Sequence, residues 1–239
     1  MTATTTAITS TTTLTDVAGA GRSRGTRRLL ACGVLAGPLF VALVVAQELT
    51  RDGFDPRRHP LSLLSLGASG WVQVTVFVVT GLLVCAAAVG MRRPLRDGVG
   101  RRWAPILFWV HGTALVWAGV FPADPMDGFP AGTPAGMPDT ISWHAILHSI
   151  APALGGLALT VAAFVFARRF AREGRRGWAV WSIVVAVVYL VLGNAGTVTG
   201  DFRLMLAGGA AIWLWASAVC AALAVPEKSL SSQATQPLP

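Results

Sequence analysis

Six long apolar runs constrain this chain of 239 residues more than any other feature. Each run is long enough to cross a hydrocarbon layer of ~30 Å, because a helix rises ~1.5 Å per residue. The runs are continuous and do not alternate, which favours helices over strands. The sequence therefore predicts an all-α, polytopic membrane protein, a bundle of six transmembrane helices. They are expected at about 29–47, 70–91, 103–121, 143–167, 178–198 and 204–225.

The charge pattern supports a membrane protein and argues against a nucleic-acid partner. Only 13% of the residues are charged, against about a quarter in soluble domains. The net charge of +8 would suggest nucleic-acid binding in a soluble protein, but here the basic residues lie between the apolar runs. Such residues set membrane topology. We therefore expect membrane lipids, and no nucleic acid, around this chain.

The basic residues also predict which way the chain crosses the membrane. Only four of the 19 lie on one predicted side, namely Arg51, Arg57, Arg58 and Arg203. Loops rich in Lys and Arg stay in the cytoplasm, so both termini are predicted there, in a bacterial plasma membrane crossed several times. Residues 1–28, Thr-rich and then basic, are expected to be a disordered cytoplasmic tail. Residues 29–225 then form the membrane domain, and 226–239 a second cytoplasmic tail.

Glycine spacing and cysteine usage bear on packing. Gly33 and Gly37, and likewise Gly196 and Gly200, offer small faces for close helix contact. Such faces serve packing within the bundle or a dimer, so the oligomeric state stays open. The three cysteines lie inside apolar runs without a CxxC pair, which predicts neither a disulfide framework nor a thiolate metal site.

Polar residues gather in two long loops on the predicted outer side. The loop 48–70 contains an apolar stretch that predicts a short helix or re-entrant segment, with His59 at its start and Ser62 and Ser65 within it. The loop 122–138 is rich in Pro and Gly, contains Asp124, and is expected to fold back over the bundle. These polar residues either line a ligand site or form a surface cap whose Asp and Arg residues pair with each other.

Two histidines begin the fourth predicted helix. His144 and His148 are four residues apart, so both project from one face about 6 Å apart along the axis. This spacing allows two imidazoles to share a metal ion, but the glutamate of an HExxH motif is absent. The alternative is two interfacial histidines hydrogen-bonded to loop carbonyls or carboxylates.

His111 lies near the middle of the third predicted helix. An ionisable side chain inside the membrane is costly and is by default a functional-site candidate. The alternative is a neutral imidazole bonded to a neighbouring helix, with Ser149 or Thr197 as its partner. Asn194 and Asp201 add polarity at the outer end of the fifth helix.

Two short motifs resemble a known family. HPLSLLSLG at 59–67, followed by GWVQ at 70–73 and Phe77, resembles the opening motif of the bacterial membrane family called domain of unknown function 998. FPADP at 121–125 and SWHAILH at 142–148 look like its second motif. The resemblance covers about residues 30–225. It implies a six-helix integral membrane protein without an assigned activity, and it places the polar outer residues at the family's own motif positions.

These observations support a binding protein more than an enzyme. In the first hypothesis an outward-facing polar pocket binds a lipid headgroup or small solute, for transport, sensing or assembly, and needs no cofactor. In the alternative, Zn²⁺ held by His144, His148 and either His111 or Asp124 activates water to hydrolyse a lipid amide or ester. A structural membrane subunit is the third possibility. The candidate ligand-binding residues are His59, Ser62, Ser65, His111, Asp124, His144, His148, Asn194 and Asp201.

Overall fold

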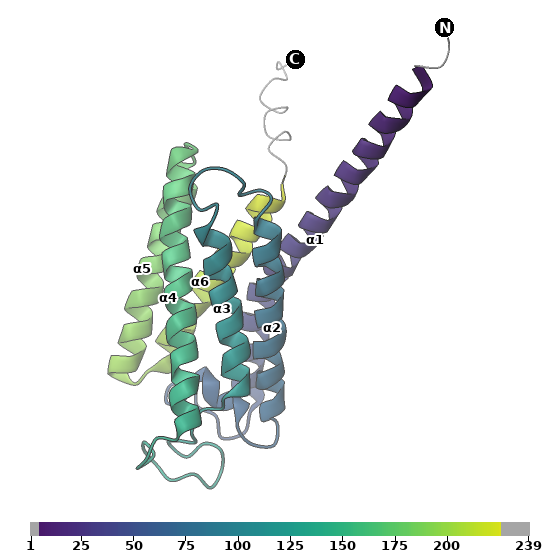
Figure 1. Ribbon diagram of the computed structural model, residues 1–239. Helices are drawn as coiled ribbons and strands as arrows, with labels where there is room; N and C mark the ends of the chain where they lie inside the picture. The colour runs from purple at the N-terminus through teal and green to yellow at the C-terminus, as the bar shows by residue number, and fades with distance from the viewer. Residues whose placement is uncertain (1–4, 226–239) are drawn as a thin grey trace, which may run out of the picture.

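The fold is a bundle of long helices, shown in Figure 1 as a computed structural model that describes residues 5–225, with side chains from residue 24 onward. Within these residues there is no β-strand beyond one isolated bridge, and six helices are long and apolar enough to cross a membrane. The predicted fold class is confirmed, while the orientation of the termini stays a prediction. The elements are α1 (Thr5–Thr50), the 3-10 helix η1 (Leu61–Ser65), α2 (Gly70–Met91), α3 (Trp103–Val120), α4 (Trp143–Arg172), α5 (Arg176–Thr199) and α6 (Phe202–Ala224).

Local sequence signals explain where the helices end. Pro122 disfavours helical geometry at Phe121, which is extended (φ −105°, ψ 111°) and ends α3. Ser142 caps α4 by accepting the Ala145 N–H. Gly200 follows α5 in the left-handed region (φ 72°), a common helix stop.

The first helix is longer than the apolar run expected at 29–47, because α1 begins at Thr5. The division into a tail at 1–28 and a membrane domain from residue 29 stays a prediction. No proline interrupts the chain before Pro38, so the membrane helix continues backward without a break. The candidate membrane span of α1 is Arg24–Thr50. The predicted tail 226–239 lies outside the described residues.

The six helices form a closed ring. Each packs against its neighbours in sequence, and α6 packs against α1 to complete the circle (Figure 1). We call the end that carries η1 and the long loops 51–69 and 121–142 the loop end. The opposite end, which carries the connections 92–102 and 173–175, is the terminal end, because the described chain begins and ends there. This arrangement places at least one residue of every membrane helix around a common interior.

The contact between α6 and α1 is close and specific. A Cβ on Gly33 would lie 2.4 Å from Cys220 Sγ, and one on Gly37 would lie 2.6 Å from the Trp213 carbonyl oxygen. The Ser217 hydroxyl accepts the Gly37 N–H at 3.0 Å and donates to the Gly33 carbonyl at 2.8 Å. The glycine pair of α1 therefore packs within the bundle.

The outer surface suits a lipid environment. Large apolar side chains such as Leu35, Leu82 and Leu157 are about 60% exposed (61%, 58% and 60%). Trp71 and Trp143 are exposed at the loop end, as is typical of tryptophans at a membrane interface. This exposed apolar belt surrounds a bundle whose charged side chains lie at its two ends.

Candidate functional site

The two long loops are joined to each other at the loop end. Arg58 donates two hydrogen bonds to the Asp127 carboxylate, at 2.8 Å and 2.5 Å. His59 is buried; its Nδ1 accepts the Asp55 N–H at 2.9 Å, and its Nε2 lies 3.1 Å from the Asp127 carbonyl, to which it donates. Both ring nitrogens of His59 are therefore engaged in holding the loops together.

We call these contacts of Arg58 and His59 with Asp127 the loop clamp, and its hydrogen bonds shift the pKa of the Asp127 carboxyl group. The hydrogen bond from Arg58 lowers the pKa of Asp127 most, and the Gly136 N–H contributes in the same direction.

The short helix expected between the first two membrane helices is η1, and its buried Leu63 and Leu64 anchor the first loop on the bundle. Ser65 of η1 donates to the Ser62 carbonyl at 2.7 Å.

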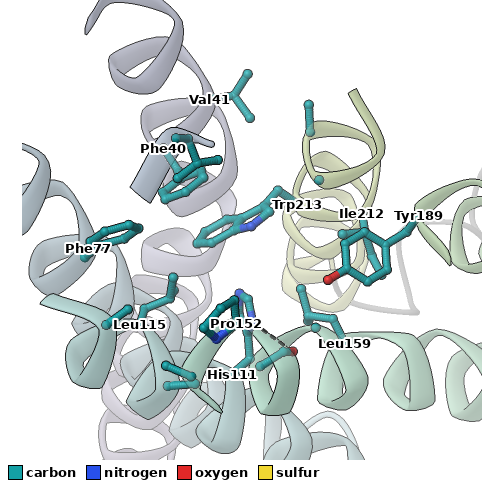
Figure 2. A pocket seen from close by; sticks show the side chains of 18 of the residues that line it. Phe40, Val41, Phe77, His111, Leu115, Pro152, Leu159, Tyr189, Ile212 and Trp213 are labelled. Atoms are coloured by element: carbon teal, nitrogen blue, oxygen red, sulfur yellow. Dashed lines mark hydrogen bonds between the residues drawn. The ribbon is translucent and has the colours of Figure 1, made fainter. Parts of the chain in front are cut away.

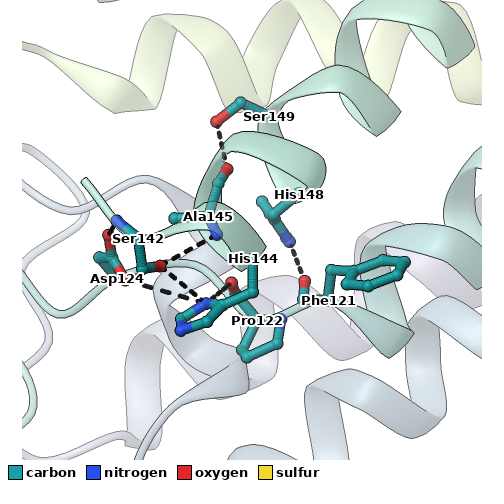
Figure 3. Close-up of polar contacts among 8 residues, drawn as sticks. All are labelled: Phe121, Pro122, Asp124, Ser142, His144, Ala145, His148 and Ser149. Atoms are coloured by element: carbon teal, nitrogen blue, oxygen red, sulfur yellow. Dashed lines mark hydrogen bonds and ion pairs between the residues drawn. The ribbon is translucent and has the colours of Figure 1, made fainter.

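A second polar cluster connects the loop 121–142 to the start of α4 (Figure 3). Asp124 accepts from the Ser142 N–H at 2.7 Å and from the Ser142 hydroxyl at 2.6 Å. His144 Nδ1 lies 3.0 Å from the Ser142 hydroxyl and 3.1 Å from the Pro122 carbonyl. Burial raises the pKa of Asp124, but the two hydrogen bonds from Ser142 and the charge of His144 together outweigh it and hold the pKa below its ordinary value.

His148 takes a different partner from His144, although both belong to the same helix. Its Nδ1 lies 2.6 Å from the Phe121 carbonyl and 3.2 Å from the Ala118 carbonyl, so it donates to the end of α3. Figure 3 shows the two imidazoles bonded to separate carbonyl groups. Among the described residues, no group of three or more His, Cys, Asp or Glu is placed to hold a metal ion.

The other two polar candidates at the loop end, Asn194 and Asp201, form hydrogen bonds only to residues near them in the sequence. Asn194 donates to the Leu190 carbonyl of its own helix at 2.7 Å. Asp201 caps α6 by accepting the Arg203 N–H at 3.2 Å and pairs with the Arg203 guanidinium. Neither side chain reaches the clusters around His59 or Asp124 through any hydrogen bond found in the described residues.

His111 stands apart from these clusters because it lies inside the bundle. It is buried in α3, and its Nδ1 lies 3.0 Å from the Gly155 carbonyl of α4. The partner is a backbone oxygen and neither Ser149 nor Thr197, whose hydroxyls donate to their own helices. His111 Nε2 is buried and has no hydrogen-bond partner among the described residues.

The protonation of the His111 ring follows from its partner. The Gly155 carbonyl only accepts hydrogen bonds, so Nδ1 carries the hydrogen. In the neutral imidazole Nε2 is then an acceptor with a free lone pair. A hydroxyl or N–H group of a bound molecule would satisfy it.

His111 lines a cavity of about 150 Å³ at the centre of the ring (Figure 2). All six membrane helices contribute, and so does Leu61 of η1. Trp213 forms part of the cavity wall. Its ring stacks on Phe40 with the centroids 4.3 Å apart, and it packs edge-on against His111 with the centroids 4.8 Å apart. The Tyr189 side chain of α5 also lines the cavity. The cavity is thus apolar, with the His111 ring and the Tyr189 hydroxyl as its polar groups.

The cavity is open on the side of α4 toward the loop end. Pro152 lines it and is exposed, although Gly156, Leu159 and Ala163 on the same helical face are buried. Ser149, one turn closer to the loop end, is exposed as well. In Figure 1 the loop-end halves of α4 and α5 diverge. A molecule in the half of the lipid layer nearest the loop end could therefore reach the cavity between these helices.

The fold and the cavity together define a multi-pass helical membrane protein with an apolar chamber at its centre. The family model described as "Protein of unknown function (DUF998)" matches residues 34–226, and the chain belongs to this family. The resemblance seen in the two sequence motifs is therefore confirmed. Neither the curated proteins nor the solved structures give a significant match.

Sequence reasoning missed three residues of these sites. Tyr189 and Trp213 lie in apolar runs, where an aromatic residue is most often a core or interfacial side chain, so nothing distinguished them. Asp127 was not among the candidate residues of its loop. Its φ of 51° and its pairing with Arg58 depend on the folded loop, and no local pattern predicts them.

Proposed function

We propose that this protein binds an amphipathic molecule of the membrane. The apolar body of this ligand would occupy the central cavity, and its hydroxyl or N–H group would donate a hydrogen bond to His111 Nε2. The observation that carries the proposal is a buried imidazole nitrogen without a partner, in a residue that lines an apolar cavity with Pro152 exposed at its edge. Concave, mostly apolar sites with few polar groups are typical of small-molecule binding. A buried acceptor left unpaired costs free energy, which a ligand would recover.

The size of the cavity limits what enters it. An engineered cavity of about 150 Å³ holds one benzene ring, so the chamber accommodates one ring or a short chain segment. The rest of the ligand would extend past Pro152 toward the lipid. A lipid-like alcohol or amide with a flexible chain meets both requirements.

This proposal modifies the polar pocket expected from the sequence. The polar side chains of the loop end hydrogen-bond to one another or to nearby backbone, as for His59, Asp124 and Asp201. Their role in the proposal is to hold the loops over the bundle. A zinc-dependent hydrolase would need His144 and His148 to exchange their present partners for one ion, and no observation favours it.

The proposal is tested by filling the cavity. A Cβ added at Gly209, which lines the cavity one turn from Trp213, meets no atom within 4 Å. Gly209→Leu should therefore occupy the chamber without a clash at Cβ. Gly193→Leu is the matched control, because Gly193 of α5 also has free space but does not line the cavity. The probe is hexadecanol with a photoreactive diazirine on its chain, and labelled peptides are mapped by mass spectrometry.

We expect labelling of the α4 and α6 segments in the wild type and in Gly193→Leu, and its loss in Gly209→Leu. His111→Phe should weaken labelling by the alcohol and leave labelling by the matching hydrocarbon unchanged. Equal labelling of the wild type and Gly209→Leu would refute the proposal.

A further inference from the structure

The terminal end of the bundle contains a second, larger cavity of different chemistry. Its volume is about 340 Å³, and it lies between α1, the loop 92–102, α4 and the last turn of α6. Five arginines and one glutamate line it, namely Arg27, Arg93, Arg96, Arg169, Arg175 and Glu173. The cavity therefore has a strong excess of positive charge.

The single glutamate neutralises only part of this charge. Glu173 pairs with Arg169 at 2.7 Å and lies 3.9 Å from Arg175. Arg175 also lies over the rings of Phe170 and Trp178, at 4.7 Å and 5.1 Å from their centroids. These contacts fix the Arg169 and Arg175 side of the cavity, and no acidic side chain among the described residues lines the other side.

Arg93 carries the clearest sign of a missing partner. Its Nη1 atom is buried and has no hydrogen-bond partner in the part of the chain that the structure describes. Burying a charged donor without an acceptor is costly, and an anion in the cavity would remove that cost. Arg27, on the α1 side, is exposed and forms no ion pair with a described acidic residue.

Apart from Thr26, the rest of the lining is apolar. Leu30, Phe170 and the end of α6 at 222–225 face the same cavity. A ligand that satisfies both parts of the lining is an anion attached to an apolar chain.

We propose that this cavity binds a phosphate group, with Arg93 and Arg27 as the main contacts. A guanidinium group binds phosphate through two parallel N–H···O hydrogen bonds. A carbonyl group or a chloride ion offers a single acceptor atom, so it cannot accept such a pair. The phosphate could belong to an anionic phospholipid or to a soluble phosphorylated molecule. The apolar wall favours the lipid, and the experiment separates the two sources.

The test uses the full chain purified in detergent and measures Kd by microscale thermophoresis. The probes are dioctanoyl phosphatidylglycerol, the zwitterionic dioctanoyl phosphatidylcholine and inorganic phosphate. Arg93→Gln and Arg27→Gln remove the proposed contacts. Arg101→Gln is the matched control, because Arg101 is exposed in the same loop and does not line the cavity. Since Arg27 is exposed, its substitution tests the proposal even if Arg93→Gln does not fold.

We expect phosphatidylglycerol to bind more tightly than phosphatidylcholine and to lose about fivefold in affinity with each substituted arginine, but not with Arg101→Gln. Weak or absent binding of inorganic phosphate would assign the site to a lipid. Inorganic phosphate that binds as well as the lipid, with the same dependence on Arg93, would support the site and assign it to a soluble phosphate. Equal affinity of both lipids, or affinity independent of Arg93 and Arg27, would overturn the proposal.

Discussion

Gln47 of α1 and Gln73 of α2 meet inside the bundle, where the Gln47 side-chain amide donates to the Gln73 side-chain oxygen at 2.7 Å. Both side chains are buried, and the Gln47 amide also donates to the Leu43 carbonyl at 3.1 Å. The pair joins the first two membrane helices through polar groups that lie away from water.

Breaking this pair should destabilise the bundle. Gln73→Leu leaves the Gln47 amide with one acceptor fewer, so we expect a loss of about 1–3 kcal/mol. The double variant Gln47→Leu/Gln73→Leu should recover part of the loss, with a coupling of about 0.6–1.7 kcal/mol. Unfolding in mixed micelles measures both. Asn194→Leu is the control, since Asn194 is exposed and binds only its own helix, and additive effects of the two Gln variants would contradict the prediction.

The contact between α6 and α1 should tolerate no added side chain. Gly37→Ala would place a methyl group 2.5 Å from Ser217 Oγ and 2.6 Å from the Trp213 carbonyl, so we expect a loss of about 1–3 kcal/mol. Gly25→Ala is the control, because a Cβ there meets nothing within 4 Å. Thermal unfolding in detergent measures the difference. A Gly37→Ala protein that unfolds like the wild type would show that the helices separate at little cost.

The loop clamp should weaken in acid. The folded pKa of Asp127 lies below its ordinary value of 3.8, chiefly because of the hydrogen bond from Arg58, so its contribution to stability is present above that value. The contribution is lost as the pH falls through the folded pKa. The wild type should thus be more stable than Asp127→Asn at pH 7, and the difference should close as the pH falls below 3.8. Melting curves at several pH values measure it, and a difference that stays constant down to pH 2 would be inconsistent with this linkage.

The charge pattern predicts that the loop end faces outward. With Cys32→Ser as background, Ala135→Cys and Asp97→Cys each place a thiol at an exposed residue of opposite ends. A membrane-impermeant maleimide should label Ala135→Cys in intact cells and Asp97→Cys only after the cells are permeabilised. The reverse pattern would place both termini outside.

The sequence predicts the helices well because each is a long apolar run with a local stop signal. The second run was expected at 70–91, where α2 lies, and the fourth to begin at 143, where Ser142 caps α4. The backward extension of α1 was missed, since a Thr-rich segment has no apolar periodicity by which to predict a helix. The closure of α6 on α1 joins segments far apart in the chain, which no local pattern specifies.

The candidate site was only partly predictable. Mid-membrane placement of His111 follows from counting residues, but its hydrogen bond to the Gly155 carbonyl depends on how α3 and α4 pack. The spacing of His144 and His148 predicts that both lie on one face of the helix. It does not predict their hydrogen-bond partners, which are carbonyl groups in a loop and at the end of α3. Every residue has a backbone carbonyl group, so the sequence does not indicate which of them will accept a hydrogen bond from a histidine.

The closure of α6 on α1 also orders events during synthesis. α1 leaves the ribosome before α6, and the Ser217 hydroxyl that bonds Gly33 and Gly37 is made 180 residues after Gly37. Until then the small-residue face of α1 has only lipid or the insertion machinery against it. A nascent chain that stops before α6 would leave α1 without its second neighbour, and quality control could recognise that exposed face.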